Sequence, residues 1–512
     1  MRTFILLVAI IIIFICMFSY TVNTYMMNDE QMYVSAGVLA QTDTIYKNFA
    51  YLQMPYLPMI YAGIYKITGT EYYLLYARIF SFLSMFASVI VIYLLGYLIT
   101  KNFVLALMGV LLYSFNEITI HAMGFAWNAA PPVVFSLLAI YFFLRMNDRG
   151  EVKPVYVFIA GLCIAIAGGI KLYYLMMILP FIAASLLFPH TYSLKYKIRF
   201  SFVPLSVGFG AGLLPALYYF FNDPQVFLFN NLGFHALNYT WHLENEFLTV
   251  GSTTTILSKL RYLMQVLGWQ TIMPFLFVVL TGIVLLVMHL RSIKTFFVYL
   301  ISNKDLFVIS TVIVVAVISA LQPSSLWQHH LAYPFPFKVL FIFSLYKALS
   351  DHYKKIFLSI AAIAALLVTV YGFPVASMHV PHMGSIERWT PVRYHNESRY
   401  ISNYLQDDAA VATIEPLRAL EGGLSIYPEF STGHFLFQVS DMLDTEERTR
   451  YRTTSVPSLP DWIREKEPPV VMIPAGHRFQ EVFYKSIEHD RYLKIEEVSD
   501  SYVIYVRAKD DN

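Results

Sequence analysis

Two adjacent carboxylates, Asp29 and Glu30, are the first candidates for chemistry in this chain of 512 residues. They follow directly on the apolar segment at the N-terminus. A carboxylate pair beside an apolar span is costly unless it is hydrated, paired or used in function. Such a group suits a general base that takes a proton from a hydroxyl group. In the structural alternative, Asn28 or Asp29 caps a helix that begins there. The residue types alone leave both interpretations open.

Isolated cations form a second group, which consists of Lys47, Lys66, Arg78 and Lys171. A cation beside an apolar surface can bind an anion such as a lipid phosphate. Alternatively, its long side chain extends along the apolar surface to reach water, and this is the favoured interpretation for Lys66. Lys171 lies in AGGIKLYY, where the glycines permit a close approach of the backbone. Both interpretations stay open for Lys171.

Three histidines, His235, His329 and His330, could join Asp29 and Glu30 as metal ligands. However, no two of these groups have the spacing of a known zinc site. The pattern therefore favours histidines that pack at the membrane interface, with phosphate or sugar contacts as an intermediate interpretation. No cofactor is predicted with certainty, and a divalent metal remains open.

The composition of the chain indicates what must position these residues. Hydrophobic residues make up 57% and charged residues only 14%, against about 25% charged residues in ordinary soluble domains. Segments of about 20 apolar residues predict membrane-crossing helices. About eleven such spans are predicted, at 4–22, 72–99, 101–118, 130–145, 154–169, 172–188, 201–221, 270–290, 305–320, 333–348 and 355–374.

The lysines and arginines of the short loops predict the orientation of these spans. Cations concentrate in loops that share one side if the N-terminus is cytoplasmic, in accordance with the positive-inside rule. The opposite loops carry few cations and several acids, among them Asp29, Glu30 and Asp43. An odd number of spans then places the C-terminal part outside. The inner cations include Lys101, Arg145, Lys153, Lys195, Lys197, Arg199, Arg291, Lys294, Lys304, Lys347 and Lys354.

The two regions expected outside the membrane differ in character. Residues 23–71 form an outer loop in which NDEQMYVSAGVLAQ and LQMPYLPMIYAGIYKI predict two short juxtamembrane helices. Residues 375–512 form a small α/β domain, with strands expected in VATIE, VVMIP, YLKIEEV and YVIYVR and helices at DWIREKE and RFQEVFYKSI. The stretch 413–435 contains residue types that often contact sugars. For most of its residues, docking of this domain onto the membrane-embedded body of residues 1–374 is favoured.

Two further features limit the functional class. Cys16 and Cys163 both lie inside apolar runs, which favours buried thiols over a disulfide or a metal pair. The formal net charge is only +2 and no basic block occurs, so a nucleic-acid partner is not expected.

The order of these motifs resembles the GT-C superfamily of glycosyltransferases that use a sugar carried on a polyprenyl phosphate. The similarity is to the protein O-mannosyltransferase and aminoarabinose transferase branch, of the glycosyltransferase family 39 type. It is carried by MNDEQMYVSAGVLAQTDTIYKNFAYLQMPYLPMIYAGIYKITG, YARIFSFLSMFASVIVIYLLG, AGGIKLYYLMMILP, FLFNNLGFHALN and HHLAYPFPF. It covers roughly residues 1–350 and, more loosely, the C-terminal domain.

The resemblance implies an inverting transfer on the outer face of the plasma or inner membrane. A sugar would move from a polyprenyl-phosphate or dolichyl-phosphate carrier to a hydroxyl of a glycan, lipid or protein acceptor. Asp29 would be the general base, Glu30 would orient the loop or the acceptor, and cations would stabilise the departing phosphate. The substrate-binding residues expected on this basis are Tyr33, Lys47, Gln53, Arg78, Asn128, Lys171, His235 and His330.

One residue departs from the pattern of the family. A second acid often stands just before the fourth span, where this chain has Asn128 in GFAWNAAPP. Asparagine can hold a hydroxyl but cannot take its proton. A non-catalytic assembly protein on the same scaffold therefore remains an alternative. A transporter or flippase for a lipid-linked or anionic substrate is another, although no internal repeat is apparent and no acid recurs deep inside the spans.

Overall fold

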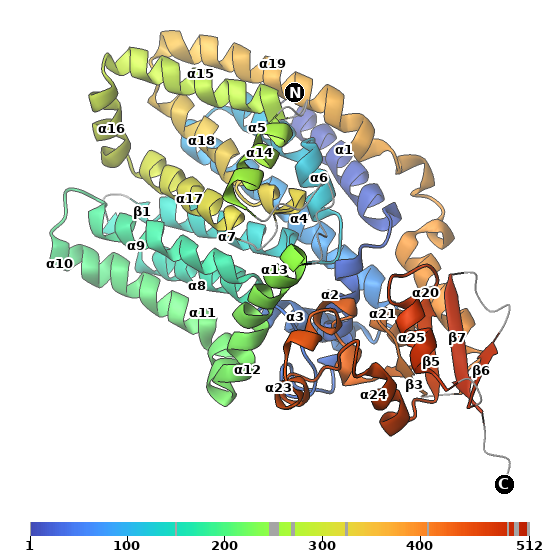
Figure 1. Ribbon diagram of the computed structural model, residues 1–512. Helices are drawn as coiled ribbons and strands as arrows, with labels where there is room; N and C mark the ends of the chain where they lie inside the picture. The colour runs from blue at the N-terminus through green and yellow to red at the C-terminus, as the bar shows by residue number, and fades with distance from the viewer. Residues whose placement is uncertain are drawn as a thin grey trace. The chain divides into compact units, whose positions relative to one another are not determined.

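The computed structural model of the chain describes residues 2–148, 151–244, 255–267, 272–322, 326–406, 409–488, 491–495 and 501–508. The chain forms two compact units. Unit 1 comprises Met1–Thr21, Phe80–Pro215 and Glu246–Pro381, and unit 2 comprises Val22–Ile79, Ala216–Asn245 and His382–Asn512. Figure 1 shows the elements along the chain.

Long apolar helices dominate the first three quarters of the sequence. Six helices among the described residues are long and apolar enough to cross a membrane. They cover Thr3–Asn23, Tyr73–Thr100, Leu194–Asn222, Ile272–Leu290, Lys304–Leu321 and Asp351–His382. They contain α1 (Arg2–Asn23), α4 (Tyr73–Thr100), α10 (Leu194–Lys197), η2 (Ile198–Phe202), α11 (Val203–Asn222), α15 (Ile272–Leu290), α17 (Lys304–Leu321), α19 (Asp351–Ser377) and η5 (Val380–His382).

Shorter helices account for the other predicted spans. They are α5 (Phe103–Ser114), α7 (Ala130–Leu144), α8 (Pro154–Ile170), η1 (Leu172–Met177) with α9 (Ile178–Leu187), and α18 (Phe335–Ala348). Each predicted span thus coincides with a helix, and the chain is a multi-pass membrane protein. The connecting elements are α6 (Glu117–Met123), β1 (Asn147–Asp148), β2 (Glu151–Val152), α14 (Ile256–Leu267), α16 (Ile293–Ser302) and η4 (Gln328–Ala332).

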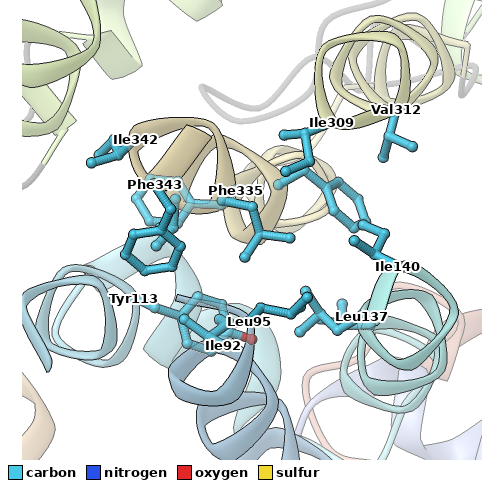
Figure 2. Close-up of a cluster of buried hydrophobic side chains, with 14 of the residues drawn as sticks. Ile92, Leu95, Tyr113, Leu137, Ile140, Ile309, Val312, Phe335, Ile342 and Phe343 are labelled. Atoms are coloured by element: carbon cyan, nitrogen blue, oxygen red, sulfur yellow. The ribbon is translucent and has the colours of Figure 1, made fainter. Parts of the chain in front are cut away.

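The core of unit 1 consists of apolar side chains from helices that are distant in sequence. Ile92 and Leu95 of α4, Leu137 and Ile140 of α7, and Phe343 of α18 are fully buried. Figure 2 shows these side chains together with residues of α5 and α17, all pointing into one cluster. Because a bilayer supplies no hydrophobic force between helices, such packing must hold the helices by close contact.

Glycines bring α8 and α11 into backbone contact within unit 1. A Cβ atom on Gly208 of α11 would lie 2.0 Å from the carbonyl oxygen of Phe158, and one on Gly161 of α8 would lie 2.2 Å from that of Leu205. A Cβ atom on Gly212, one turn after Gly208, would lie 2.6 Å from the Cβ atom of Ala165. This is the small-xxx-small arrangement by which membrane helices pack closely. The glycines therefore fix the distance between these two helices.

Unit 2 combines helices from three parts of the sequence. α2 (Asn28–Leu39) and α3 (Tyr56–Thr68) are the two short helices expected in the 23–71 loop. α12 (Pro224–Leu228), η3 (Phe229–Gly233) and α13 (Phe234–Glu244) follow α11. The C-terminal part adds η6 (Ile386–Arg388), α20 (Thr390–Ser402), α21 (Pro416–Glu421), η7 (Pro428–Phe430), α22 (His434–Phe437), η8 (Ser440–Met442), α23 (Thr445–Arg450), α24 (Leu459–Lys466) and α25 (Gln480–Ser486).

A five-stranded mixed sheet organises the C-terminal part of unit 2. Its strands are β3 (Ala410–Ala412), β4 (Ser425–Ile426), β5 (Val470–Pro474), β6 (Tyr492–Ile495) and β7 (Tyr502–Arg507), in the order β4-β3-β5-β7-β6. β3 runs parallel to β4 and β5, whereas β7 is antiparallel to β5 and β6. The four strands expected from the sequence are present, and β4 is an additional strand of two residues.

Both faces of this sheet are covered. Along β5, Val471 and Ile473 belong to one apolar cluster, while Val470 and Met472 belong to the cluster on the opposite face. This alternation follows from the two-residue period of a strand. Val38 of α2 packs against the second cluster, so α2 is part of the same structure as the sheet.

The glycine contact between α8 and α11 leads to a prediction about stability. Gly208→Ala places a methyl group against a carbonyl oxygen, and overpacking of this kind costs about 1–3 kcal/mol. Gly210→Ala is the matched control, because nothing lies within 4 Å of its Cβ position and alanine is the better helix former. Thermal unfolding in detergent should show a lower midpoint for Gly208→Ala and an unchanged or higher midpoint for Gly210→Ala. Equal midpoints would contradict the close contact.

Candidate functional site

The acidic pair predicted from the sequence lies in the first turn of α2. The helix begins at Asn28, and Met27 is its N-cap. The backbone N–H of Met27 donates to Oε2 of Glu30 at 3.0 Å. Glu30 therefore closes the start of the helix, and neither Asn28 nor Asp29 is the capping residue. Asp29 is half-buried in the first turn.

A buried ion pair joins Glu30 to Arg78 at the head of α4. Nε of Arg78 donates to Oε1 of Glu30 at 2.9 Å, and Nη2 donates to Oε2 at 2.8 Å. Both side chains are 0% exposed. A two-pronged contact between a guanidinium and a carboxylate is the strongest geometry available to such a pair. It compensates two charges that would be very costly to bury separately.

The same guanidinium also binds the segment that leads into α2. Nη1 donates to the carbonyl oxygen of Thr24 at 2.9 Å, and Nη2 donates to that of Tyr25 at 2.8 Å. Arg78 thus holds both the approach to α2 and its first turn. This geometry favours a positioning role for Arg78 over the direct phosphate contact expected from the sequence.

Gln31 fixes the next position of α2. Its Nε2 donates to the hydroxyl of Tyr394 on α20 at 2.9 Å, and its Oε1 accepts from the backbone N–H of Leu417 on α21 at 3.0 Å. Glu30 and Gln31 are therefore both engaged by other elements of unit 2. Asp29, which precedes them, is held in place from two directions.

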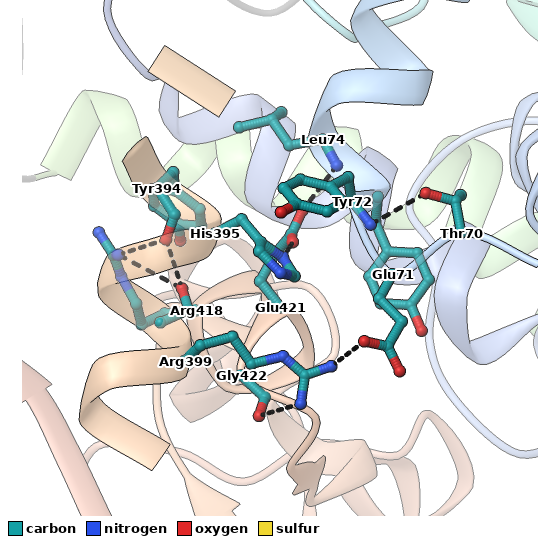
Figure 3. A network of polar contacts seen from close by, with 12 residues as sticks. Thr70, Glu71, Tyr72, Leu74, Tyr394, His395, Arg399, Arg418, Glu421 and Gly422 are labelled. Atoms are coloured by element: carbon teal, nitrogen blue, oxygen red, sulfur yellow. Dashed lines mark hydrogen bonds and ion pairs between the residues drawn. The ribbon is translucent and has the colours of Figure 1, made fainter. Parts of the chain in front are cut away.

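A polar network extends this support through the C-terminal part of unit 2. Glu421 accepts from the backbone N–H of Leu74 at 2.7 Å through Oε1, and its Oε2 lies 2.6 Å from Nδ1 of His395. Figure 3 shows this contact beside the ion pair between Arg399 and Glu71. Burial raises the pKa of Glu421, while His395 opposes that effect. The start of α4 is thereby tied to α20 and α21.

Arg418 completes the network. Its guanidinium lies 3.6 Å from the ring centroid of Tyr394 and donates to the carbonyl oxygen of Tyr394 at 3.0 Å. It also donates to the hydroxyl of Tyr502 on β7 at 3.1 Å. These contacts join α21 to α20 and to the sheet within the C-terminal part of unit 2. The contacts that Arg418, Tyr394, Glu421 and Gln31 make were not predicted from the sequence.

The other predicted residues of unit 2 occupy several elements. Tyr33 is buried, lies one helical turn after Asp29, and its ring contacts that of Tyr51 at 6.1 Å. The carbonyl oxygen of Gln53 accepts from the hydroxyl of Tyr46. Lys47 is exposed, with its carbonyl oxygen bound by Arg452, and His235 is half-buried on α13.

Lys171 belongs to a separate cluster in unit 1. It ends α8, is 8% exposed, and its Nζ lies 5.0 Å from the ring centroid of Tyr173. A Cβ atom on Gly168 would lie 2.0 Å from a side-chain atom of Leu175 in η1. The glycine thus permits the close approach expected from the sequence, and the chain can turn from α8 into η1 beside the lysine.

The remaining predicted residues of unit 1 lie around His329. The ring of His329 contacts those of Trp127 at 4.7 Å and His330 at 4.2 Å. Burial lowers the pKa of His329, and the charges of Lys171 and His121 lower it further. Asn128, which follows Trp127, is 3% exposed.

His330 has a local structural contact in the same cluster. Its Nδ1 accepts from the backbone N–H of Trp327 at 3.2 Å. Among the described residues, no group of three or more His, Cys, Asp or Glu side chains is arranged to hold a metal ion.

Comparison with known proteins identifies the fold. No protein-family model and no curated protein matches the chain. ArnT from Cupriavidus metallidurans, bound to undecaprenyl phosphate, matches with a TM-score of 0.63 and 12% identity over 99% of this chain and 98% of that one. The apo oligosaccharyltransferase from Archaeoglobus fulgidus matches with a TM-score of 0.48 and 11% identity, over 99% of this chain and 74% of that one. The similarity to ArnT confirms the expected GT-C fold.

The buried pair generates a prediction that a double-mutant cycle can check. Arg78→Met leaves the Glu30 carboxylate buried without its guanidinium, which should destabilise the protein by about 3–5 kcal/mol. Glu30→Gln combined with Arg78→Met removes both charges and should restore part of that loss. The measurement is the free energy of unfolding in detergent for both single variants and the double variant. Additive effects would show that the two residues do not act as a pair.

Proposed function

We propose that this chain is an inverting glycosyltransferase that moves a sugar from a polyprenyl-phosphate carrier to an acceptor hydroxyl on the outer face of the membrane. The observation that carries the proposal is the half-buried Asp29, which is followed by two residues that other elements hold in place. The fold shared with ArnT, whose structure contains undecaprenyl phosphate, supports the class of donor.

The reaction requires a base positioned at the acceptor. Asp29 accepts the proton of the acceptor hydroxyl as its oxygen attacks the anomeric carbon of the sugar. The new oxygen–carbon bond forms on one face of the sugar, and the bond from the anomeric carbon to the phosphate oxygen breaks on the other. The configuration inverts, and polyprenyl phosphate leaves with the bonding electrons. General-base catalysis of this kind contributes about 10²–10⁴-fold to the rate.

Glu30 and Arg78 act as positioning residues in this proposal. Their charges compensate each other within the buried pair, and proton transfer is proposed for Asp29. Because Arg78 also binds the carbonyl oxygens of Thr24 and Tyr25, the segment before Asp29 is restrained. A base held in this way loses little entropy when the acceptor binds.

Lys171 is proposed to bind the phosphate of the carrier. A buried ammonium group at the end of a helix can stabilise the negative charge that grows on the leaving phosphate. Hydrogen bonds to the sugar or the acceptor are proposed for the predicted polar and aromatic set Tyr33, Lys47, Gln53, Asn128, His235 and His330.

The proposed orientation places the N-terminus in the cytoplasm and the C-terminal domain outside, in the plasma or inner membrane. It rests on the lysines and arginines of the short loops. Nucleotide sugars are cytoplasmic, so a sugar used outside arrives on a lipid carrier. The sidedness therefore supports the donor class independently of the fold.

Replacement of the base should abolish transfer without unfolding the protein. Asp29→Asn is expected to reduce sugar transfer from a polyprenyl-phosphate donor at least 100-fold, because an amide cannot accept the proton. The matched control is Asp43→Asn, which changes an exposed acid of the same loop and should retain activity. Transfer and lipid translocation are measured together in liposomes with a panel of donors. Full transfer by Asp29→Asn, or translocation without any transfer by the unaltered protein, would overturn the proposal.

Removal of the ammonium group of Lys171 should weaken carrier binding. Lys171→Met is expected to reduce affinity for undecaprenyl phosphate about tenfold, the effect of one lost charge-assisted contact. Lys66→Met, at an exposed position of α3, is the control and should bind normally. Direct binding to purified protein in nanodiscs measures both. Equal affinities of the two variants for undecaprenyl phosphate would contradict the proposal that Lys171 binds the phosphate.

A further inference from the structure

Three elements of unit 2 bring cationic and aromatic side chains together away from Asp29 in the sequence. Trp241 and His242 lie on α13, His434 begins α22, and His477 and Arg478 lie between β5 and α25. We call these five residues the basic cluster. Arg478 is exposed, whereas Trp241, His434 and His477 are half-buried, so the cluster is reachable from solvent.

The guanidinium of Arg478 is oriented by its neighbours. Its Cζ lies 4.9 Å from the ring centroid of Trp241 and 4.8 Å from that of Phe479. Its Nη2 donates to Oε1 of Gln438, whose Nε2 donates to Oδ1 of Asn238 at 3.0 Å. A guanidinium fixed in this way presents a planar set of donors that matches a carboxylate or a phosphate.

The imidazole rings of His242, His434 and His477 are close enough to Arg478 for its positive charge to lower their pKa values. The rings of His434 and His477 are 5.7 Å apart. Burial, together with the charges of Arg478 and His477, lowers the pKa of His434 to about 3. Burial and Arg478 also lower the pKa values of His477 and His242. At neutral pH the imidazoles are therefore uncharged groups that can both donate and accept hydrogen bonds.

This combination suits one class of ligand. An anionic group would form an ion pair with the guanidinium of Arg478 and would reduce the positive electrostatic potential at the imidazoles. Neutral imidazoles suit sugar hydroxyls, which also donate and accept hydrogen bonds. The indole of Trp241 and the ring of Phe435, which lies 4.3 Å from that of His434, add apolar faces of the kind that pack against a sugar ring.

We infer that the basic cluster binds an anionic saccharide, through a carboxylate or phosphate substituent on the acceptor. The inference rests on the proposed function, because it names the class of acceptor that a glycosyltransferase of this kind would use. It adds a contact surface on unit 2 that recognises charge, distinct from Asp29, which is proposed to act on the hydroxyl.

Binding of defined oligosaccharides to the full-length protein in nanodiscs tests the inference. The Asp29→Asn background blocks turnover, so binding is measured without transfer. Trigalacturonic acid and a trimannoside 6-phosphate are the carboxylate and phosphate probes, and maltotriose is the neutral control. At least one anionic probe should bind ten times more tightly than maltotriose, and the preferred probe identifies the substituent.

Variants assign this preference to the cluster. Arg478→Gln should abolish the tenfold preference, whereas Arg464→Gln, at an exposed arginine of α24, should leave it intact. If Arg478→Gln fails to fold, Trp241→Leu and His477→Gln take its place and should each weaken the anionic probe at least threefold. Equal binding of all three saccharides, or a preference that survives every cluster variant, would overturn the inference. Binding only to vesicles of phosphatidylglycerol would overturn it too.

Failure of this inference is distinguishable from failure of the proposed function. Loss of the anionic preference leaves transfer to a neutral acceptor by the unaltered protein as a separate measurement. Conversely, a protein without transferase activity can still show the preference in the binding assay.

Discussion

The ion pair between Glu30 and Arg78 is the interaction on which the candidate site depends. Both charges are fully buried, and each would be very costly to bury alone. The cost is offset because the guanidinium engages both carboxylate oxygens and two carbonyl oxygens of the segment before α2. The path of the chain from Thr24 to Glu30 therefore follows from the position of one arginine. Asp29 lies within that path, so its placement is a consequence of the pair.

Three consecutive residues at the start of α2, Asp29, Glu30 and Gln31, have side chains that point in different directions. Side chains of successive helical residues point about 100° apart. Glu30 can therefore bind α4 through Arg78 while Gln31 binds α20 and α21 through Tyr394 and Leu417. Asp29 points in a third direction and stays half-buried. The sheet also helps to position these helices. Arg418 on α21 donates a hydrogen bond to the hydroxyl of Tyr502 on β7, which fixes α20 and α21 in part. Asp29, the proposed base on this short helix, is thereby positioned by distant elements.

Most helices and strands of this arrangement can be predicted from the sequence, but the contacts between distant residues cannot. Apolar length predicts the spanning helices, and short runs rich in β-branched and aromatic residues predict the four longer strands, because both signals are local. β4 has two residues and shows no period. The isolated cation Arg78 is equally compatible with a phosphate or a carboxylate partner, and only the fold decides between them. Glu421 and Leu74 are 347 positions apart, so no local pattern connects them. The spacing of Gly208 and Gly212 indicates a close helix contact, but not that α8 is the partner.

The ion pair between Arg78 and Glu30 also affects which cation is proposed to bind the carrier phosphate. If Arg78 turned to a phosphate, Glu30 would remain buried without its counter-charge, and a broken buried pair costs about 3–5 kcal/mol. The hydrogen bonds to Thr24 and Tyr25 would be lost as well, which would release the segment that positions Asp29. A phosphate bound at Arg78 would thus weaken the placement of Asp29, the proposed base. The proposed function avoids this conflict, because it gives Arg78 a positioning role through Glu30 and proposes Lys171 for the phosphate.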